Sequence, residues 1–166
     1  MNQLGRDRKG VLFVCMGNIC RSPLAEGIFL HLASERGVRD RFLVDSAGTG
    51  AWHTGEPADP RSIAVALARG VHLPSIARQV DPESDFERFD LILAMDRSNR
   101  TGLLNLGAPS ERVRLMRSFD STLRGAPEDE LDVPDPYYGR GDGFVRVYDM
   151  LHRATTGLLD ELMRGE

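Results

Sequence analysis

The stretch Val14-Cys15-Met16-Gly17-Asn18-Ile19-Cys20-Arg21-Ser22-Pro23 decides how this chain folds. The apolar residues 11–14 in front of it predict a buried β-strand, and residues 24–32 behind it predict a helix. Ser22 and Pro23 suit the start of that helix, as a capping side chain and a proline at the first helical position. We therefore expect a cysteine where a strand ends, followed by a tight loop and a helix N-terminus.

Such a loop has the features of an anion-binding site. Its backbone N–H groups turn toward one point, and the helix dipole adds partial positive charge there. Arg21 adds a planar fork of donors that matches phosphate, and the same field favours the thiolate of Cys15. The spacing of these two residues is weak evidence alone in an arginine-rich chain, where the alternative is a buried structural cysteine beside a surface arginine.

Length and composition describe one globular domain. The chain has 166 residues, of which 41% are hydrophobic and 28% are charged. Its net charge of -4 disfavours nonspecific binding to nucleic acid, and no run of about 18 apolar residues predicts a membrane span. The polar residues 1–9 predict a flexible N-terminal tail, followed by a single domain over 10–166. The absence of a signal peptide favours a cytoplasmic protein, with secretion by another route left open.

The cysteines and histidines form no pattern of a metal site. The two cysteines lie five positions apart in one loop, and the four histidines are scattered. The sequence therefore predicts no metal and no cofactor.

Strands and helices alternate along the rest of the chain. Further strands are expected at 41–46, 76–80, 91–95 and 113–116. Helices are expected at 60–67, after Asp96 and at 144–163, with a short helix or turn at 81–86. Several strands are apolar throughout, which indicates an α/β fold with a parallel sheet covered on both faces. Ligands bind beyond the carboxyl ends of such strands, where Cys15, Ser46 and Asp96 lie.

Three stretches closely resemble the low-molecular-weight protein tyrosine phosphatases. They are residues 14–23, the segment from Asp45-Ser46-Ala47 to Trp52, and Asp135-Pro136-Tyr137-Tyr138-Gly139. Their order and separations also fit, so the resemblance spans nearly the whole chain after the tail. It implies a flavodoxin-like three-layer sandwich with a central four-stranded parallel sheet.

The resemblance also implies a metal-free, two-step hydrolysis of phosphotyrosine in phosphoproteins, with inorganic phosphate as a product. Cys15 is expected to form a phosphocysteine, Arg21 to hold the phosphate oxygens, and Asp135 to act as general acid and base. The remaining phosphate-binding residues of the loop are then Met16, Gly17, Asn18, Ile19, Cys20 and Ser22.

Other residues are expected to support the loop or to line the pocket. Ser22 would hydrogen-bond to the sulfur, and Asn18 would hold the loop's shape with Ser46 among its partners. Trp52, Tyr137 and Tyr138 would form an aromatic rim around the substrate. The sequence alone also allows a core position for Trp52, a strand-end cap for Ser46 and a hydrophobic lid for the two tyrosines.

Several positions keep alternative interpretations. Asp135 is favoured over Asp132 as the acid because prolines restrict its backbone on both sides, although it could be one solvated charge among several. Cys20 could be a small buried hydrophobe, but the favoured hypothesis is a protective disulfide with an oxidised Cys15. Many members of the family carry a loop-bracing histidine where this chain has Ser75. Asp96 is expected to be structural, and the histidines to be surface or packing residues: His31, His53, His72 and His152.

Three rival functions use the same loop or fold. A thioredoxin-coupled arsenate reductase needs further cysteines, and this chain has only two. A protein arginine phosphatase carries threonine where this chain has Ile19. A noncatalytic phosphate-binding module would be free to lose Cys15 or Asp135. The physiological substrate, phosphorylation of Tyr137 or Tyr138, and the choice between a monomer and a weak homodimer stay open.

Overall fold

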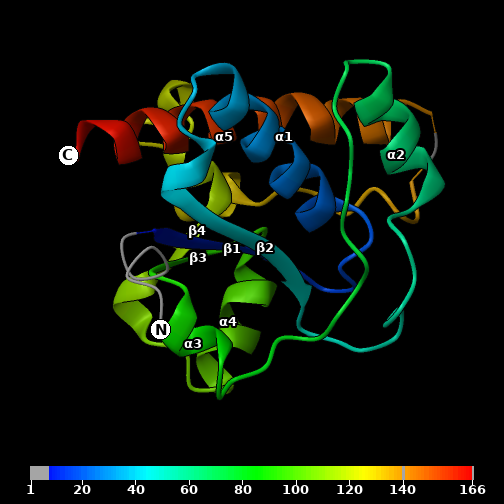
Figure 1. Cartoon of the computed structure of the whole chain (residues 1–166). Helices are drawn as coiled ribbons and strands as arrows, with labels where there is room; N and C mark the ends of the chain where they lie inside the picture. Colours follow the sequence, from blue (N-terminus) through cyan, green and yellow to red (C-terminus); the bar gives the residue numbers. More distant parts are fainter. Residues whose placement is uncertain (1–7, 140, 166) are drawn as a thin grey trace.

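A four-stranded parallel sheet forms the centre of the computed structural model, which describes residues 8–139 and 141–165. The strands lie in the order β2-β1-β3-β4. Their bounds are β1 Lys9–Cys15, β2 Phe42–Gly48, β3 Leu91–Ala94 and β4 Val113–Leu115. Helices cover both faces of the sheet, which confirms the predicted three-layer, flavodoxin-like α/β fold (Figure 1).

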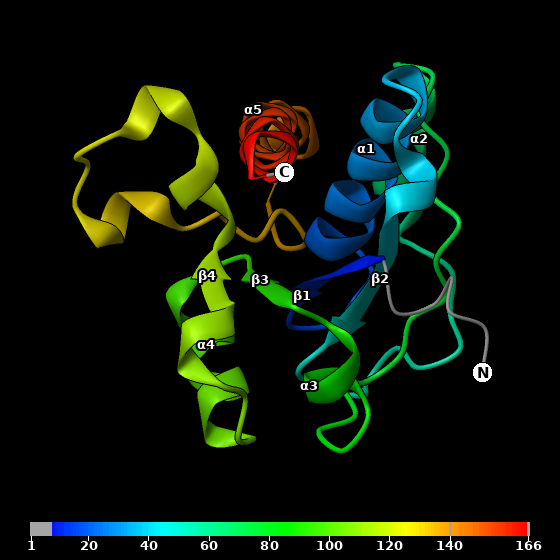
Figure 2. The same ribbon diagram turned by 60° about the vertical axis from the view of Figure 1, so that its left-hand side comes forward.

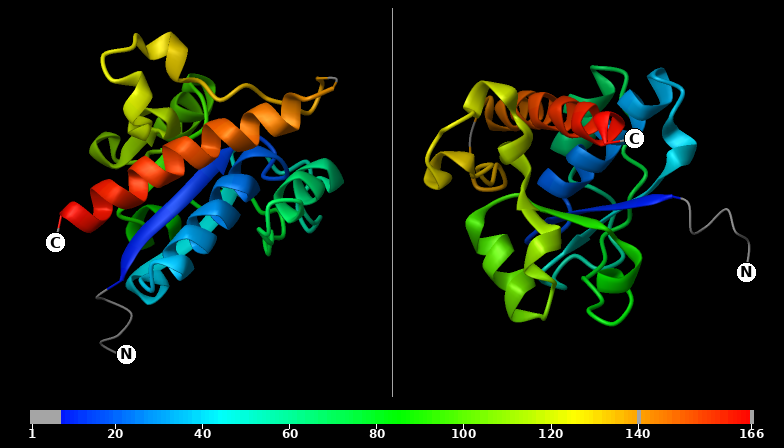
Figure 3. Two further views of the ribbon diagram at one scale, coloured as in Figure 1. Left: turned by 90° about the horizontal axis from the view of Figure 1, so that it is seen from above. Right: turned by 90° about the vertical axis from the view of Figure 1, so that its left-hand side faces the viewer.

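The helices divide unequally between the two faces (Figure 2). One face carries α1 Arg21–Glu35, α2 Pro60–Leu67 and α5 Gly143–Arg164, and the other carries α3 Asp85–Arg88 and α4 Arg97–Asn105. Seen from above, α1 and α5 lie side by side along β1 (Figure 3). Alternate residues of β1 therefore enter two separate cores, which is why its sequence is continuously apolar.

The carboxyl ends of the strands meet at one edge of the sheet. Cys15 at the end of β1 lies in register with Gly48 at the end of β2. Val14 lies in register with Ala94, and its carbonyl accepts a hydrogen bond of 3.1 Å from the N–H of Met95. Side chains that follow β1, β2 and β3 are thus brought together at this edge.

The predicted strand at 76–80 is wrong. The segment forms only isolated bridges, between Gln79 and Gly48 and between Ile76 and Pro57. The N–H of Gly48 donates to Arg78, and the carbonyl of Gly48 accepts from Val80. The segment therefore crosses the end of β2 and pairs with a single residue there.

Two boundaries also differ from the predictions. Helix α1 begins at Arg21, and its N-cap residue, Cys20, makes no side-chain capping hydrogen bond. The hydroxyl of Ser22 does not cap the helix, because it is used inside the preceding loop. Residues 1–7 of the predicted tail lie outside the described residues, whereas Lys9 belongs to β1.

Candidate functional site

The loop from Met16 to Ser22 presents a row of backbone donors. Within the described part of the chain, none of the N–H groups from Met16 to Ser22 donates a hydrogen bond. Asn18 has φ 57° and is the one non-glycine residue with positive φ among those described. This conformation and the N-terminus of α1 make the loop a cradle for an anion.

A chain of hydrogen bonds fixes the environment of the Cys15 sulfur. Cys15 is buried, with its Sγ atom 3.0 Å from the Oγ atom of Ser22. Asn18 Nδ2 donates both to Ser22 Oγ at 2.8 Å and to Ser46 Oγ at 3.0 Å. Ser46 in turn donates to Glu26 Oε1 at 2.6 Å. Since Ser22 accepts from Asn18, its own hydrogen is available to the sulfur, where it stabilises a thiolate.

A backbone N–H group, that of Arg78, stabilises the cysteine loop through Asn18. Asn18 Oδ1 accepts a hydrogen bond of 3.0 Å from the N–H of Arg78. The guanidinium of Arg78 pairs with Asp85 at 2.9 Å and with Asp45 at 3.1 Å, which fixes that segment. Ser75 has a buried hydroxyl oxygen without a hydrogen-bond partner among the described residues. The brace therefore runs through the Arg78 backbone, and Ser75 takes no part in it.

Arg21 joins the loop to two distant segments. Its side chain is 3% exposed, and Nη1 donates to Asp96 Oδ2 at 2.6 Å and to the carbonyl of Val133 at 3.0 Å. Nη2 lies 3.7 Å from Asp135 Oδ2. Burial opposes the charge, but Cys15 and the hydrogen bond to Asp96 raise the pKa of Arg21 above its ordinary value. The structural role expected for Asp96 therefore includes positioning this guanidinium.

A narrow cavity of about 50 Å³ brings the predicted catalytic residues together. Its walls come from the cysteine loop, from His53 and from the segment around Asp135. The lining residues are Cys15, Met16, Gly17, Ile19, Cys20, Arg21, His53, Asp135, Tyr137 and Tyr138. Sulfur, guanidinium and carboxylate thus face one space.

Asp135 and Asp132 differ sharply in their surroundings. Asp135 lines the cavity, and its Oδ1 accepts a hydrogen bond of 3.0 Å from the N–H of Tyr137. Asp132 lies outside the cavity and accepts from the side chain of Arg97 at 3.0 Å. Partial burial pushes the pKa of Asp132 upward, but Arg97 outweighs it and lowers that pKa. Of these two carboxylates, only Asp135 shares a cavity with Cys15.

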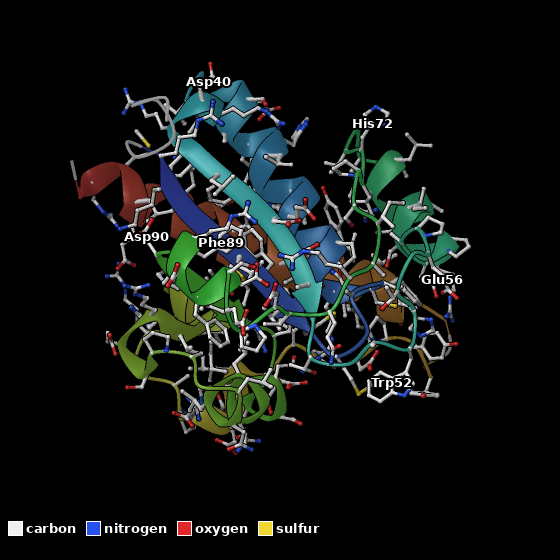
Figure 4. The ribbon with its side chains drawn as sticks, turned by 60° about the horizontal axis from the view of Figure 1, so that its bottom comes forward. Asp40, Trp52, Glu56, His72, Phe89 and Asp90 are labelled. Atoms are coloured by element: carbon white, nitrogen blue, oxygen red, sulfur yellow. The ribbon has the colours of Figure 1, made fainter. Side chains whose placement is uncertain are left out.

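The aromatic rim differs in part from the predicted one. The rings of Tyr137 and Tyr138 meet edge to face with centroids 4.9 Å apart. Trp52 is 71% exposed, so the core position is wrong; it is not among the cavity residues, although its loop borders them. Figure 4 shows Trp52 and Glu56 near one another at the same end of the molecule. The part of Trp52 in substrate binding stays a prediction.

His53 is a cavity residue that the sequence analysis placed among surface and packing histidines. A Cβ atom on Gly17 would lie only 3.0 Å from the His53 ring, so a larger residue there would push this ring aside. The Nδ1 atom of His53 lies 2.8 Å from Glu56 Oε2. Its position directly after Trp52 in the rim segment was the available signal.

Asp59 and Arg61 join the two loops and were also missed. The N–H of Asp59 donates to the carbonyl of Ile19 at 2.8 Å, and its carboxylate pairs with Arg61 at 3.0 Å. Arg61 Nη1 donates to the carbonyl of Tyr137 at 3.3 Å, and its guanidinium lies 5.4 Å from the centre of that ring. The start of α2 therefore holds the cysteine loop and the Asp135 segment together.

Cys20 is a buried free thiol, like Cys15. Burial raises the pKa of Cys20 to about 12, and the negative charges of Asp59 and Cys15 add to the effect. Cys20 is therefore protonated near neutral pH, and its predicted disulfide with Cys15 stays a prediction.

The described residues offer neither a metal site nor a membrane-spanning helix. Over residues 8–139 and 141–165, no group of three or more His, Cys, Asp or Glu side chains could hold a metal ion. None of the helices in the same residues has the length and apolar character needed to cross a membrane.

Comparisons with known proteins agree with this geometry. Residues 10–166 match the family model described as low molecular weight phosphotyrosine protein phosphatase. The low molecular weight protein-tyrosine-phosphatase of Streptomyces coelicolor is 48% identical over 153 residues, which cover 90% of each chain.

Solved structures are similar over nearly the whole chain. A protein tyrosine phosphatase of Entamoeba histolytica has a TM-score of 0.86 at 39% identity, with 95% of this chain and 98% of that one covered. A Drosophila arginine phosphatase has a TM-score of 0.81 at 31% identity, with 92% and 96% covered. This chain belongs to the low molecular weight phosphotyrosine protein phosphatase family.

Proposed function

We propose that this phosphatase hydrolyses phosphotyrosine in proteins through a phosphocysteine on Cys15, with Asp135 as general acid and base. The observation that carries the proposal is the shared cavity, in which the Cys15 sulfur, 3.0 Å from Ser22 Oγ, faces the same space as Arg21 and Asp135. A nucleophile, a cation and a proton donor are the three groups that this displacement needs.

The first step transfers the phosphoryl group to sulfur. The Cys15 thiolate attacks phosphorus, an S–P bond forms, and the bond from phosphorus to the tyrosine oxygen breaks. Asp135 gives its proton to that leaving oxygen. Arg21 and the free N–H groups of residues 16–22 hold the phosphoryl oxygens and their charge in the transition state.

The second step releases inorganic phosphate. Water attacks phosphorus and gives a proton to the Asp135 carboxylate, while the S–P bond breaks and the thiolate returns. The hydroxyl of Ser22 stabilises the sulfur as a nucleophile in the first step and as a leaving group in the second. Both steps use groups that this chain supplies.

An aryl substrate suits the mouth of the cavity. Ile19 lines the cavity with an apolar side chain, and Tyr137 and Tyr138 offer flat aromatic surfaces. The similarity to an arginine phosphatase makes phosphoarginine the second candidate substrate. The same chemistry implies phosphoproteins as partners, and we propose a cytoplasmic location as a separate hypothesis.

A substrate panel with two variants tests the proposal. Turnover of 4-nitrophenyl phosphate and phosphotyrosine in the presence of EDTA is expected to exceed that of phosphoserine, phosphoarginine and arsenate. Cys15→Ser should abolish turnover, and Asp135→Ala should slow it by about 10² to 10⁴-fold, with a smaller loss on the activated nitrophenyl ester. Robust turnover by Cys15→Ser, or a preference for phosphoarginine, would refute the assignment.

A further inference from the structure

A second surface pocket lies beside β2, away from the cysteine loop. Its volume is about 270 Å³, and it reaches from Asp40 to Pro74 and to Glu26 of α1. Asp40 lies near the start of β2, and Trp52 near the opposite end of the molecule (Figure 4). The pocket is therefore separate from the cavity that holds Cys15.

Glu26 is the buried charged group of this pocket. The residue is 5% exposed, and its Oε1 atom accepts the hydrogen bond of Ser46 at 2.6 Å. Among residues 8–139 and 141–165, no donor reaches its second oxygen and no cation forms an ion pair with it. Burial raises the pKa of Glu26 to about 7, a shift that the Ser46 hydrogen bond opposes. This carboxylate can therefore still accept a donor, and a positive charge beside it would relieve the cost of burying it.

The remaining lining residues define the kind of ligand. Leu30, Val44 and Pro74 form an apolar part of the lining, beside a larger polar part. Arg8, Arg39 and Asp40 also line the pocket and are exposed, so solvent and salt screen their charges. The buried Glu26 is screened much less, so it decides the sign of the charge that the pocket prefers. A ligand with an apolar body and one N–H-bearing cation fits both features.

We propose that this pocket binds a small primary amine with an apolar body, whose ammonium group pairs with Glu26. The pocket is joined to the catalytic sulfur by the hydrogen bonds from Ser46 to Glu26, from Asn18 to Ser46 and Ser22, and between Ser22 and Cys15. A cation on Glu26 keeps the carboxylate ionised, and so keeps the Ser46 hydrogen directed toward it. Ser46 then continues to accept from Asn18, and the Ser22 hydrogen stays on the sulfur. Occupancy should therefore favour the Cys15 thiolate.

Other charged groups also act on this pocket. Asp45 raises the pKa of Glu26, and Arg78 lowers it. Arg8, Arg39 and Asp40 line the same pocket, and the adjoining pocket is lined by His31 and His72. Glu26→Gln removes the carboxylate and leaves the other charged groups of both pockets in place, so it isolates the contribution of Glu26.

Binding of benzylamine to the full chain, followed by NMR titration, tests the site without any need for turnover. The carboxylate of Glu26 is about one-tenth ionised at pH 6 and about nine-tenths at pH 8, so affinity should rise about tenfold between them. Benzyl alcohol, which has the same body without the charge, should bind at least tenfold more weakly at pH 8. Equal binding of the alcohol, or an unchanged affinity in Glu26→Gln, would overturn the proposal.

A second variant tests the pocket independently, in case Glu26→Gln does not fold. Leu30→Trp fills the pocket from α1 without touching the hydrogen-bond chain, and it should abolish benzylamine binding. Leu104→Trp, on α4 at the opposite face, should bind like the parent. Retained binding in Leu30→Trp would show that the amine lies elsewhere.

The link to the catalytic sulfur has its own measurement. At pH 6.5 saturating benzylamine should speed iodoacetamide alkylation of Cys15 by up to about fourfold, because about a quarter of Glu26 is ionised there without ligand. Benzylamine that binds but leaves this rate unchanged would refute the link. Alkylation needs no phosphate ester, so failure of the proposed phosphatase reaction would leave both measurements intact.

Discussion

Replacing Asp96 by asparagine tests whether one ion pair positions Arg21. The two side chains meet at 2.6 Å, where Arg21 is 3% and Asp96 21% exposed. Asp96 is also the N-cap of α4, with Oδ1 accepting from the N–H of Asn99 at 2.7 Å. Asparagine caps helices about as well as aspartate, so Asp96→Asn removes the charge and keeps the cap.

The expected magnitude follows from the strength of the bond that changes. A hydrogen bond to a charged group contributes about 1.5–3 kcal/mol to stability, and a neutral one about 0.5–1.5 kcal/mol. The variant should therefore lose about 1–2 kcal/mol of unfolding free energy. If the Asp96 charge stabilises the transition state through Arg21 by the same free energy, kcat/KM should fall about 5- to 30-fold, because about 1.4 kcal/mol corresponds to a factor of ten.

Urea unfolding and steady-state kinetics with 4-nitrophenyl phosphate measure the two effects separately. Asp132→Asn is the matched control, because Asp132 also pairs with an arginine, Arg97, but lies outside the catalytic cavity. The control should keep the parent kcat/KM. The reasoning fails if Asp96→Asn loses stability yet keeps kcat/KM within twofold, or if Asp132→Asn loses as much activity.

Three further predictions concern the loops and the buried ionisable groups. Arg61→Ala should lower kcat severalfold because it releases the Asp135 segment from α2, whereas Arg69→Ala, beyond the end of the same helix, should keep the parent kcat in the same assay. Iodoacetamide at pH 7 should label Cys15 but not Cys20, whose thiol pKa is about 12, and peptide mass spectrometry would reveal equal labelling if this is wrong. The contribution of Glu26 to the unfolding free energy should fall by about 3 kcal/mol between pH 4.5 and 7, because the folded state raises the pKa of this carboxyl from 4.5 to about 7 and so binds more protons than the unfolded state. Urea titrations across this range should show a flatter profile for Glu26→Gln.

The sheet was predictable because both of its faces are buried. The apolar runs 11–14 and 91–95 have no polar side to present, and such runs occur mainly in covered parallel strands. The segment 76–80 has a similar composition, yet it meets β2 only at Gly48 and forms its other bridge with Pro57. An apolar composition indicates that a segment is buried, but it does not indicate whether the segment pairs along a neighbouring strand.

At the start of α1, contacts within the cysteine loop replace the capping hydrogen bond that the local sequence predicts for Ser22. Ser22 followed by Pro23 is a good helix-start pattern, and the helix does begin within a residue of it. The serine hydroxyl, however, lies between Asn18 and the Cys15 sulfur, so it cannot also cap the helix. The helix-start pattern predicted where α1 begins, but the hydrogen bonds of the folded loop determine the partners of the Ser22 hydroxyl.

The residues missed from sequence are those whose role depends on contacts across the chain. Arg61 reaches the carbonyl of Tyr137 across 76 positions, and no local pattern predicts that contact. His53 was placed among surface residues for lack of a visible partner, although Glu56 lies only three positions away. Proline neighbours and aromatic residues, visible in the sequence itself, favoured Asp135 over Asp132, and Asp135 is the one that lines the cavity with Cys15.

The bonds of Arg21 also have a consequence for how activity appears during folding. The Arg21 guanidinium binds Asp96, which lies 75 positions later in the chain, and Val133, which lies 112 positions later. Contacts of such long range cost much loop-closure entropy and form late in folding. The recovery of phosphatase activity after dilution from urea should therefore lag behind the recovery of helical signal. Enzymatic turnover would then report the completed assembly of the whole domain.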